Sequence, residues 1–186
     1  MTGQRRRSKQ EAVLRLAAAV LDYPGDDFGV EVWLEALSGR SHRQLATAVQ
    51  EWLAVPAAQR QQQYIRIFDF GGHSLYLTYL THGETRQRGT ALLEIKRELA
   101  SGGLAITSGE LPDYLPLLLE FAAIEERGRR LLADYRDALV RLADDLGDQE
   151  GPFGLVLKAV LAALPRSRTL LPIVEITDTD EMAVRR

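Results

Sequence analysis

Apolar residues recur at intervals of three and four along almost the whole chain, which is the spacing of amphipathic helices. Gly and Pro residues stand at the ends of most of these stretches, as expected where helices stop. Helices are therefore predicted over residues 13–20, 30–37, 45–52, 56–68, 74–83, 85–100, 113–124, 131–146 and 153–164. The pattern predicts an all-α fold, a single-domain helical bundle of roughly eight or nine helices.

Several residues in this pattern are typical of helix starts. Ser41 and Gln44 have the spacing of a capping box, and Pro56 suits the first position of a helix. Asp113 is expected to cap the helix that follows it, and Pro116 then falls in the first turn, where a missing N–H is tolerated.

The stretch SLYLTYL, residues 74–80, has the composition of a strand. A lone strand in an all-helical chain would leave its backbone groups without partners, so a short helix is expected from about Ser74 to Gly83. Such a helix is apolar over most of its circumference. Either it is buried in the core, or one face binds another protein.

The two ends of the chain lack this helical pattern. Residues 1–10 are expected to form a flexible basic tail, and residues 165–186 a mobile tail. Between them, no linker or internal repeat interrupts the pattern. Residues 11–164 are therefore expected to form one helical domain.

The composition of the chain argues against several classes of function. The chain has 186 residues, a net charge of −3 and no cysteine. This balance argues against nucleic-acid binding, and the lack of cysteine excludes disulfides and thiolate metal sites. No apolar run reaches the roughly 18 to 20 residues that cross a membrane, and Glu11 and Arg15 interrupt the only stretch resembling an export signal. A soluble cytoplasmic protein without membrane insertion is expected.

Few residues suggest catalysis. Asp69 and His73 are four residues apart, as in a helical metal-binding pair, but Gly71 and Gly72 lie between them and no third ligand has suitable spacing. No nucleophile, base and oxyanion donor come together in the sequence. A small helical enzyme using Asp69 and His73 is kept as an alternative, and the main expectation is a protein that is not an enzyme.

Three local blocks carry a resemblance to a known family. They are YIRIFDFGGHSLYLTYLTHGETRQRGTALL at residues 64–93, ELPDYLPLLLEF at 110–121 and LDYPGDDF at 21–28. These blocks resemble the NarJ-type chaperones, the delta-subunit assembly proteins of respiratory nitrate reductase. The resemblance extends over about residues 11–164, and one small departure is Glu84, where the family pattern has Asp.

The resemblance implies an all-helical chaperone that carries no cofactor of its own. It would bind the N-terminal segment of the catalytic alpha subunit of nitrate reductase. Molybdenum cofactor and iron–sulfur insertion would then precede membrane assembly, with cofactor-delivery proteins as further partners. The alternative is a chaperone of the same kind for another molybdoenzyme, of the dimethyl sulfoxide or trimethylamine oxide reductase type.

The blocks also suggest which residues contact the client. Aromatic side chains suit an apolar binding surface, and carboxylates near them could attract Lys or Arg side chains of the client. The expected client-binding residues are Tyr64, Phe68, Asp69, Tyr76, Tyr79, Glu84, Arg86, Arg88, Asp113, Tyr114 and Glu120. Two alternatives stay open: the aromatic residues could belong to the core, and Asp113 could serve only as a helix cap.

Overall fold

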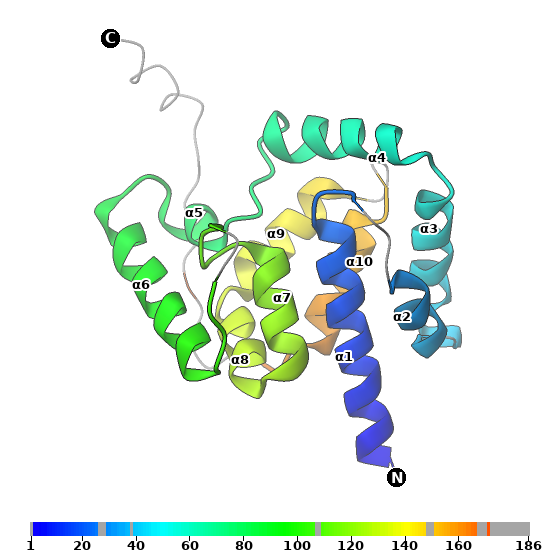
Figure 1. Ribbon diagram of the computed structural model, residues 1–186, viewed down its shortest axis with the longest axis horizontal. Coiled ribbons are helices and arrows are strands. Elements are labelled where there is room, and N and C mark those ends of the chain that lie inside the picture. The colour runs from blue at the N-terminus through cyan, green and yellow to red at the C-terminus, as the bar shows by residue number, and fades with distance from the viewer. Residues whose placement is uncertain are drawn as a thin grey trace.

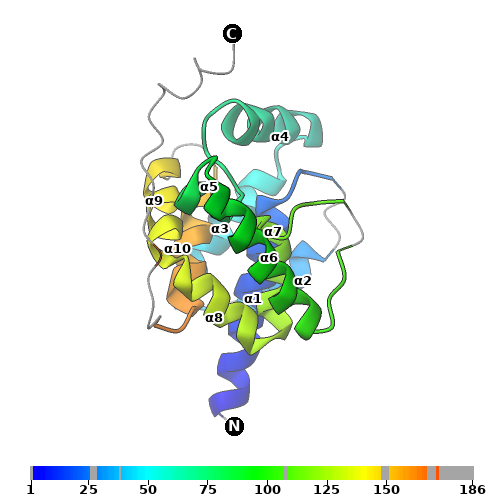
Figure 2. The same ribbon diagram turned by 90° about the vertical axis from the view of Figure 1, so that its left-hand side faces the viewer.

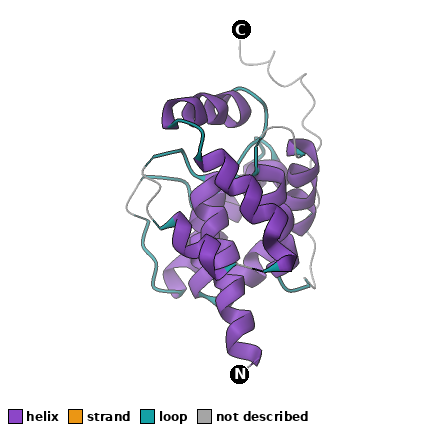
Figure 3. Cartoon of the chain, turned by 90° about the vertical axis from the view of Figure 1, so that its right-hand side faces the viewer, coloured by secondary structure: helices purple, strands orange, loops and turns teal. Residues whose placement is uncertain are grey.

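The computed structural model describes residues 2–25, 29–37, 39–106, 109–147, 151–166 and 171. Within these residues the chain forms α-helices with one 3₁₀ turn and one π-helical turn, and it contains no strand (Figures 1 and 3). The predicted all-α class is confirmed. The helices are α1 Thr2–Leu21, α2 Val30–Ala36, α3 Arg43–Leu53, α4 Ala57–Tyr64, α5 Leu77–His82, α6 Arg86–Ser101, α7 Leu115–Ile124, α8 Glu126–Asp134, α9 Arg136–Leu146 and α10 Phe153–Ala163.

Helix α1 is the centre of the bundle. It packs against α7, α10 and α2, and Figure 1 shows these helices around it. Leu14 and Leu21, which share one side of α1, and Leu16 on the opposite side are all fully buried. Phe121 of α7 and Leu157 of α10 close the core on two sides. No helix in the described part of the chain is long and apolar enough to cross a membrane.

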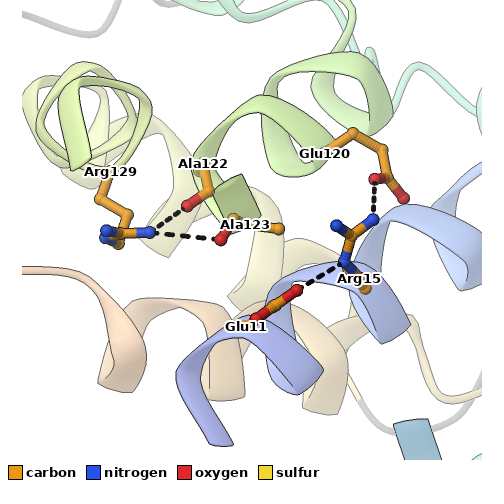
Figure 4. Close-up of polar contacts among 6 residues, drawn as sticks. All are labelled: Glu11, Arg15, Glu120, Ala122, Ala123 and Arg129. Carbon is orange, nitrogen blue, oxygen red and sulfur yellow. Dashed lines mark hydrogen bonds and ion pairs between the residues drawn. The ribbon is translucent and has the colours of Figure 1, made fainter. Parts of the chain in front are cut away.

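The corner between α7 and α8 is tightly built. Gly128 lies so close to α7 that a Cβ atom there would stand 2.8 Å from both Cα and N of Ala122. The guanidinium of Arg129 donates to the carbonyl oxygens of Ala122 and Ala123, near the end of α7 (Figure 4). Carbonyls at a helix C-terminus lack partners within the helix, so this arginine satisfies two of them from the next helix.

Two predicted helix starts are wrong. The capping box at Ser41 and Gln44 does not form, because Arg40–His42 make a 3₁₀ turn and the Ser41 hydroxyl lies 3.1 Å from Nδ1 of His42. Asp113 does not cap α7, whose N-cap is Tyr114 without a side-chain hydrogen bond. Its carboxylate instead faces α5, as described below.

Other boundaries also differ from the pattern. Helix α1 begins at Thr2, so residues 2–10, which the sequence suggested as a tail, are helical. The stripe expected over 131–146 is divided at Tyr135 into α8 and α9. The helix expected to end at residue 68 changes at Ile65 into a π-helical turn that ends at Asp69. Most of the predicted C-terminal tail lies outside the described residues, although the N–H of Leu171 donates to the carbonyl of Asp134 at 3.1 Å.

We expect Gly128→Ala to lower the free energy of unfolding by about 1–3 kcal/mol, because the added methyl would overlap the backbone of α7. Gly89 provides the matched control, since it lies inside α6 with open space around its Cα. Gly89→Ala should raise stability by about 0.5–1 kcal/mol. Denaturant unfolding measures both changes, and equal effects of the two substitutions would contradict the close packing of this corner.

Candidate functional site

A two-residue backbone pairing joins the start of α5 to the start of α7. Tyr76 and Tyr114 form an isolated antiparallel bridge. The N–H of Leu77 donates to the carbonyl of Asp113 at 3.1 Å, and the N–H of Leu115 donates to the carbonyl of Leu75 at 2.8 Å. The expectation that this stretch is helical from Ser74 is therefore wrong. Its first residues are extended because a partner 35 or more residues away satisfies their backbone groups.

Asp113 holds the first turn of α5 from outside that helix. Its side chain is fully buried, and its Oδ2 accepts the backbone N–H of Thr78 at 3.1 Å as well as the Thr78 hydroxyl. A carboxylate at a helix N-terminus satisfies otherwise unpaired N–H groups and interacts favourably with the helix dipole. Its Oδ1 has no partner among the described residues. The aspartate thus caps α5 rather than α7.

Arg88 extends this arrangement to α6. Its Nε donates to the Thr78 hydroxyl oxygen at 3.2 Å, its guanidinium lies 5.5 Å from the ring centre of Tyr79, and Nη1 stands 3.5 Å from Glu84. Because the single Thr78 hydroxyl proton is donated to Asp113, the same oxygen can accept from Arg88. A continuous set of contacts therefore links α6, α5 and Asp113 in the segment before α7.

Four tyrosines gather beside this pairing, and we call Tyr23, Tyr64, Tyr76 and Tyr114 the tyrosine cluster. The rings of Tyr76 and Tyr114 are 5.4 Å apart, and those of Tyr23 and Tyr64 are also 5.4 Å apart. The Tyr64 and Tyr114 hydroxyls are joined by a 3.1 Å hydrogen bond. The cluster thus brings together the end of α1, the end of α4 and the starts of α5 and α7.

The hydroxyl groups of the cluster form a directed chain. Tyr114 donates its proton to Oδ1 of Asp22 at 2.9 Å. Since a hydroxyl has one proton, Tyr64 must donate to Tyr114 in the bond between them. Tyr76 donates to Glu110 at 3.2 Å. The final acceptor is therefore a carboxylate in both cases, Asp22 for Tyr64 and Tyr114 and Glu110 for Tyr76.

Burial changes the acidity of these phenols. It raises the pKa of Tyr64 to about 12, and Asp22 and Asp69 add to the rise. Burial also raises the pKa of Tyr114 and, with Glu110, the pKa of Tyr76. The phenols therefore remain neutral hydrogen-bond donors over the physiological range.

The aromatic residues of the cluster divide into core and surface. Tyr64 is only 6% exposed, and its ring lies 4.8 Å from that of Phe68, which in turn lies 5.2 Å from Phe153 of the core. Tyr76 and Tyr114 are half-buried, whereas Tyr23 is 49% exposed. The exposed aromatic surface of the cluster, which we call the tyrosine face, consists of Tyr23, Tyr76 and Tyr114.

The predicted site residues are only partly brought together. Tyr64, Phe68, Tyr76, Tyr114 and Asp113 lie in or beside the cluster, and Tyr79, Glu84 and Arg88 lie in the adjoining contact between α5 and α6. Asp69 and Arg86 are exposed. Glu120 pairs instead with Arg15 of α1 at 3.0 Å, beside Glu11 (Figure 4). Burial raises the Glu120 pKa, although Arg15 opposes the rise.

Sequence reasoning missed Asp22, Tyr23 and Glu110. All three lie inside the quoted blocks LDYPGDDF and ELPDYLPLLLEF, so the blocks themselves were the available signal. In the described part of the chain no group of three or more His, Asp or Glu residues is arranged to hold a metal ion. Asp69 and His73 therefore receive no third ligand from those residues.

Comparison with known proteins agrees with the resemblance. The family model described as nitrate reductase delta subunit matches residues 34–149. A Bacillus subtilis (strain 168) protein named as a probable nitrate reductase molybdenum cofactor assembly chaperone, NarJ, is 32% identical over 156 residues, or 79% of this chain and 85% of that protein.

Two further relatives have different lengths. An Escherichia coli (strain K12) protein named as a probable chaperone of the same kind, NarW, is 29% identical over 154 residues, or 80% of this chain and 66% of that protein. A nitrate reductase-like protein NarX from Mycobacterium tuberculosis (strain H37Rv) is 35% identical over 155 residues. That match covers 81% of this chain and only 24% of the longer protein. The predicted resemblance is confirmed.

We expect Asp113→Ala to lower the free energy of unfolding by about 1.5–3 kcal/mol, because two hydrogen bonds to a charged acceptor are lost and α5 loses its cap. Asp144→Ala is the control, since Asp144 is an exposed carboxylate on α9. Denaturant unfolding measures both variants. If Asp113→Ala were no more destabilising than Asp144→Ala, the capping role would be wrong.

Stability should fall in alkaline solution. Burial raises the pKa of Tyr64 in the folded state to about 12, above the ordinary value near 10. The contribution of the neutral phenol to stability is therefore complete below about pH 10. It is lost as the pH rises toward 12, because the unfolded chain loses this proton first. The free energy of unfolding, measured across this window, should decrease with pH. Tyr64→Phe should make the decrease shallower, and an unchanged slope in that variant would refute the assignment.

Proposed function

Because the chain belongs to the nitrate reductase delta-subunit family, we propose that it is a chaperone for the assembly of a nitrate reductase. We infer that its client is the catalytic alpha subunit of that enzyme, bound through the N-terminal segment before the enzyme is complete. The proposal rests above all on the family match over residues 34–149, which contains both paired segments that carry Tyr76 and Tyr114.

The tyrosine face has the properties that peptide recognition requires. Half-exposed aromatic rings bury a large area while few side-chain rotors are ordered, and their hydroxyls tolerate a wet edge. The rings of Tyr76 and Tyr114 are held by the backbone bridge between them, so little ordering remains to be done when a partner binds. An amphipathic client helix would place its apolar side on these rings.

Holding the client's N-terminal segment would keep the catalytic subunit open for its cofactors. We propose that molybdenum cofactor and iron–sulfur cluster insertion take place in this complex, in the cytoplasm and with the help of cofactor-delivery proteins. The chain's own contribution is to bind and orient the client. Reversible binding suits this role, because the chaperone must leave when the client is complete.

Calorimetric titration of the full chain tests this function. The ligand is a peptide of roughly 15 to 20 residues that copies the N-terminus of the nitrate reductase alpha subunit from the same organism. We expect roughly micromolar binding, about −8 kcal/mol. A peptide from another molybdoenzyme of that organism, of the dimethyl sulfoxide reductase type, should bind much more weakly. Absence of binding to the nitrate reductase peptide would refute the proposed recognition.

A pair of variants tests whether the peptide binds to the tyrosine face. Tyr76→Ala removes a half-buried ring and should weaken peptide binding at least tenfold, which corresponds to about 1.4 kcal/mol. Val140→Ala truncates an exposed apolar side chain of α9 and should leave binding unchanged. The melting temperature of each variant is measured in parallel. Equal binding by both variants would move the site elsewhere.

A further inference from the structure

The carboxylate of Asp22 lies in an electrostatically unfavourable position. Asp22 follows directly after α1, and its N–H still donates to the carbonyl of Ala18 at 3.1 Å. A negative side chain at a helix C-terminus meets the negative end of the helix dipole, which is unfavourable. The side chain is exposed and forms no ion pair with a described residue.

One oxygen of this carboxylate is fixed and the other is available. Oδ1 accepts the Tyr114 hydroxyl at 2.9 Å and the backbone N–H of Tyr23 at 2.9 Å. Within the described residues Oδ2 has no hydrogen bond or ion pair. The orientation of the carboxylate is therefore set before any ligand arrives, which lowers the ordering cost of binding.

The surroundings are negative as well as aromatic. Asp69 is exposed, and its carboxylate also makes no hydrogen bond or ion pair among the described residues. Asp22 and Asp69 both act on the Tyr64 hydroxyl, and each raises its pKa. Two carboxylates thus act on one buried phenol, and neither forms an ion pair with a described residue.

Tyr23 supplies an apolar contact next to this charge. Its ring lies 5.4 Å from that of Tyr64 in an edge-to-face arrangement, and half of its surface remains exposed. An aromatic ring beside a carboxylate suits a long cationic side chain, whose methylene stem covers the ring while its charged end reaches the oxygen. A divalent metal is poorly suited, because it requires several oxygen ligands and only one oriented oxygen is available here.

We propose that Asp22, oriented by Tyr114 and flanked by Tyr23, anchors a Lys or Arg side chain of the bound client segment. The inference rests on the proposed function and names the chemistry that the client must present. Asp69 contributes to the negative potential, whereas Asp22 makes the direct contact. The client segment recognised by this face therefore carries a basic residue beside the apolar residues that cover the rings of Tyr76 and Tyr114.

Calorimetric titrations with the full chain test the anchor. The probe is the alpha-subunit N-terminal peptide, together with analogues in which each Lys or Arg is replaced singly by Gln. We expect Asp22→Asn to weaken binding of the native peptide by about three- to tenfold and to reduce its salt dependence. Asp144→Asn, an exposed carboxylate on α9, should change neither.

The peptide analogues turn this comparison into a double-mutant cycle. One analogue should bind the wild type and Asp22→Asn equally, which identifies the anchored residue. Tyr114→Phe keeps the ring but removes the bond that orients Asp22, and it should produce a smaller loss of the same kind. Asp22→Asn should keep its full melting temperature, since it removes a charge that the helix dipole disfavours.

Each outcome decides between the two proposals. If the wild type binds the native peptide but Asp22→Asn binds it with equal affinity and equal salt dependence, the anchor is refuted and the chaperone function stands. If every analogue loses the same affinity in the wild type and in Asp22→Asn, no basic residue is coupled to Asp22, and the anchor is again refuted. If the wild type binds no peptide, both proposals fail.

Discussion

The backbone pairing between residues 75–77 and 113–115 is the contact on which the rest of the site depends. It fixes where α5 begins, because the residues before Leu77 are held extended by the segment that precedes α7. Asp113 also caps α5 by accepting the N–H of Thr78. Arg88 of α6 donates to the hydroxyl of the same threonine and so connects α6 to α5. Figure 2, in which the left-hand side of Figure 1 faces the viewer, shows α5 and α6 next to each other. Without the pairing, the rings of Tyr76 and Tyr114 would have no common support.

Periodicity predicted much of the fold because most helices have one clearly buried stripe. Helix α6 begins and ends within a residue of its expected bounds, and α10 does so too. The pattern could not show that Tyr135 divides one stripe between two helices, since its ring is buried on either interpretation. It also could not show that Asp113 caps α5, because a capping aspartate looks the same in sequence whichever helix it serves. Such choices depend on contacts between residues far apart in the chain.

The same limit applies to the site. The family blocks led to the right part of the molecule but did not separate fold from binding. Arg88 and Asp113 hold helices together, and Tyr64 is mostly core. Asp22 was missed because its contact with Tyr114 spans 92 positions of the sequence. Sequence patterns indicate which residues are buried, whereas a binding surface is defined by what remains exposed after folding.

Hydrogen exchange of the full chain, with and without the alpha-subunit N-terminal peptide, tests the central claim most directly. If the tyrosine face binds this segment, amide protection should increase over residues 74–79 and 111–115 and at the end of α1, and should stay unchanged over α9. Both paired segments should respond together, because the backbone bridge joins them. Saturating peptide that protects α9 or α10 and leaves both paired segments unchanged would contradict the account.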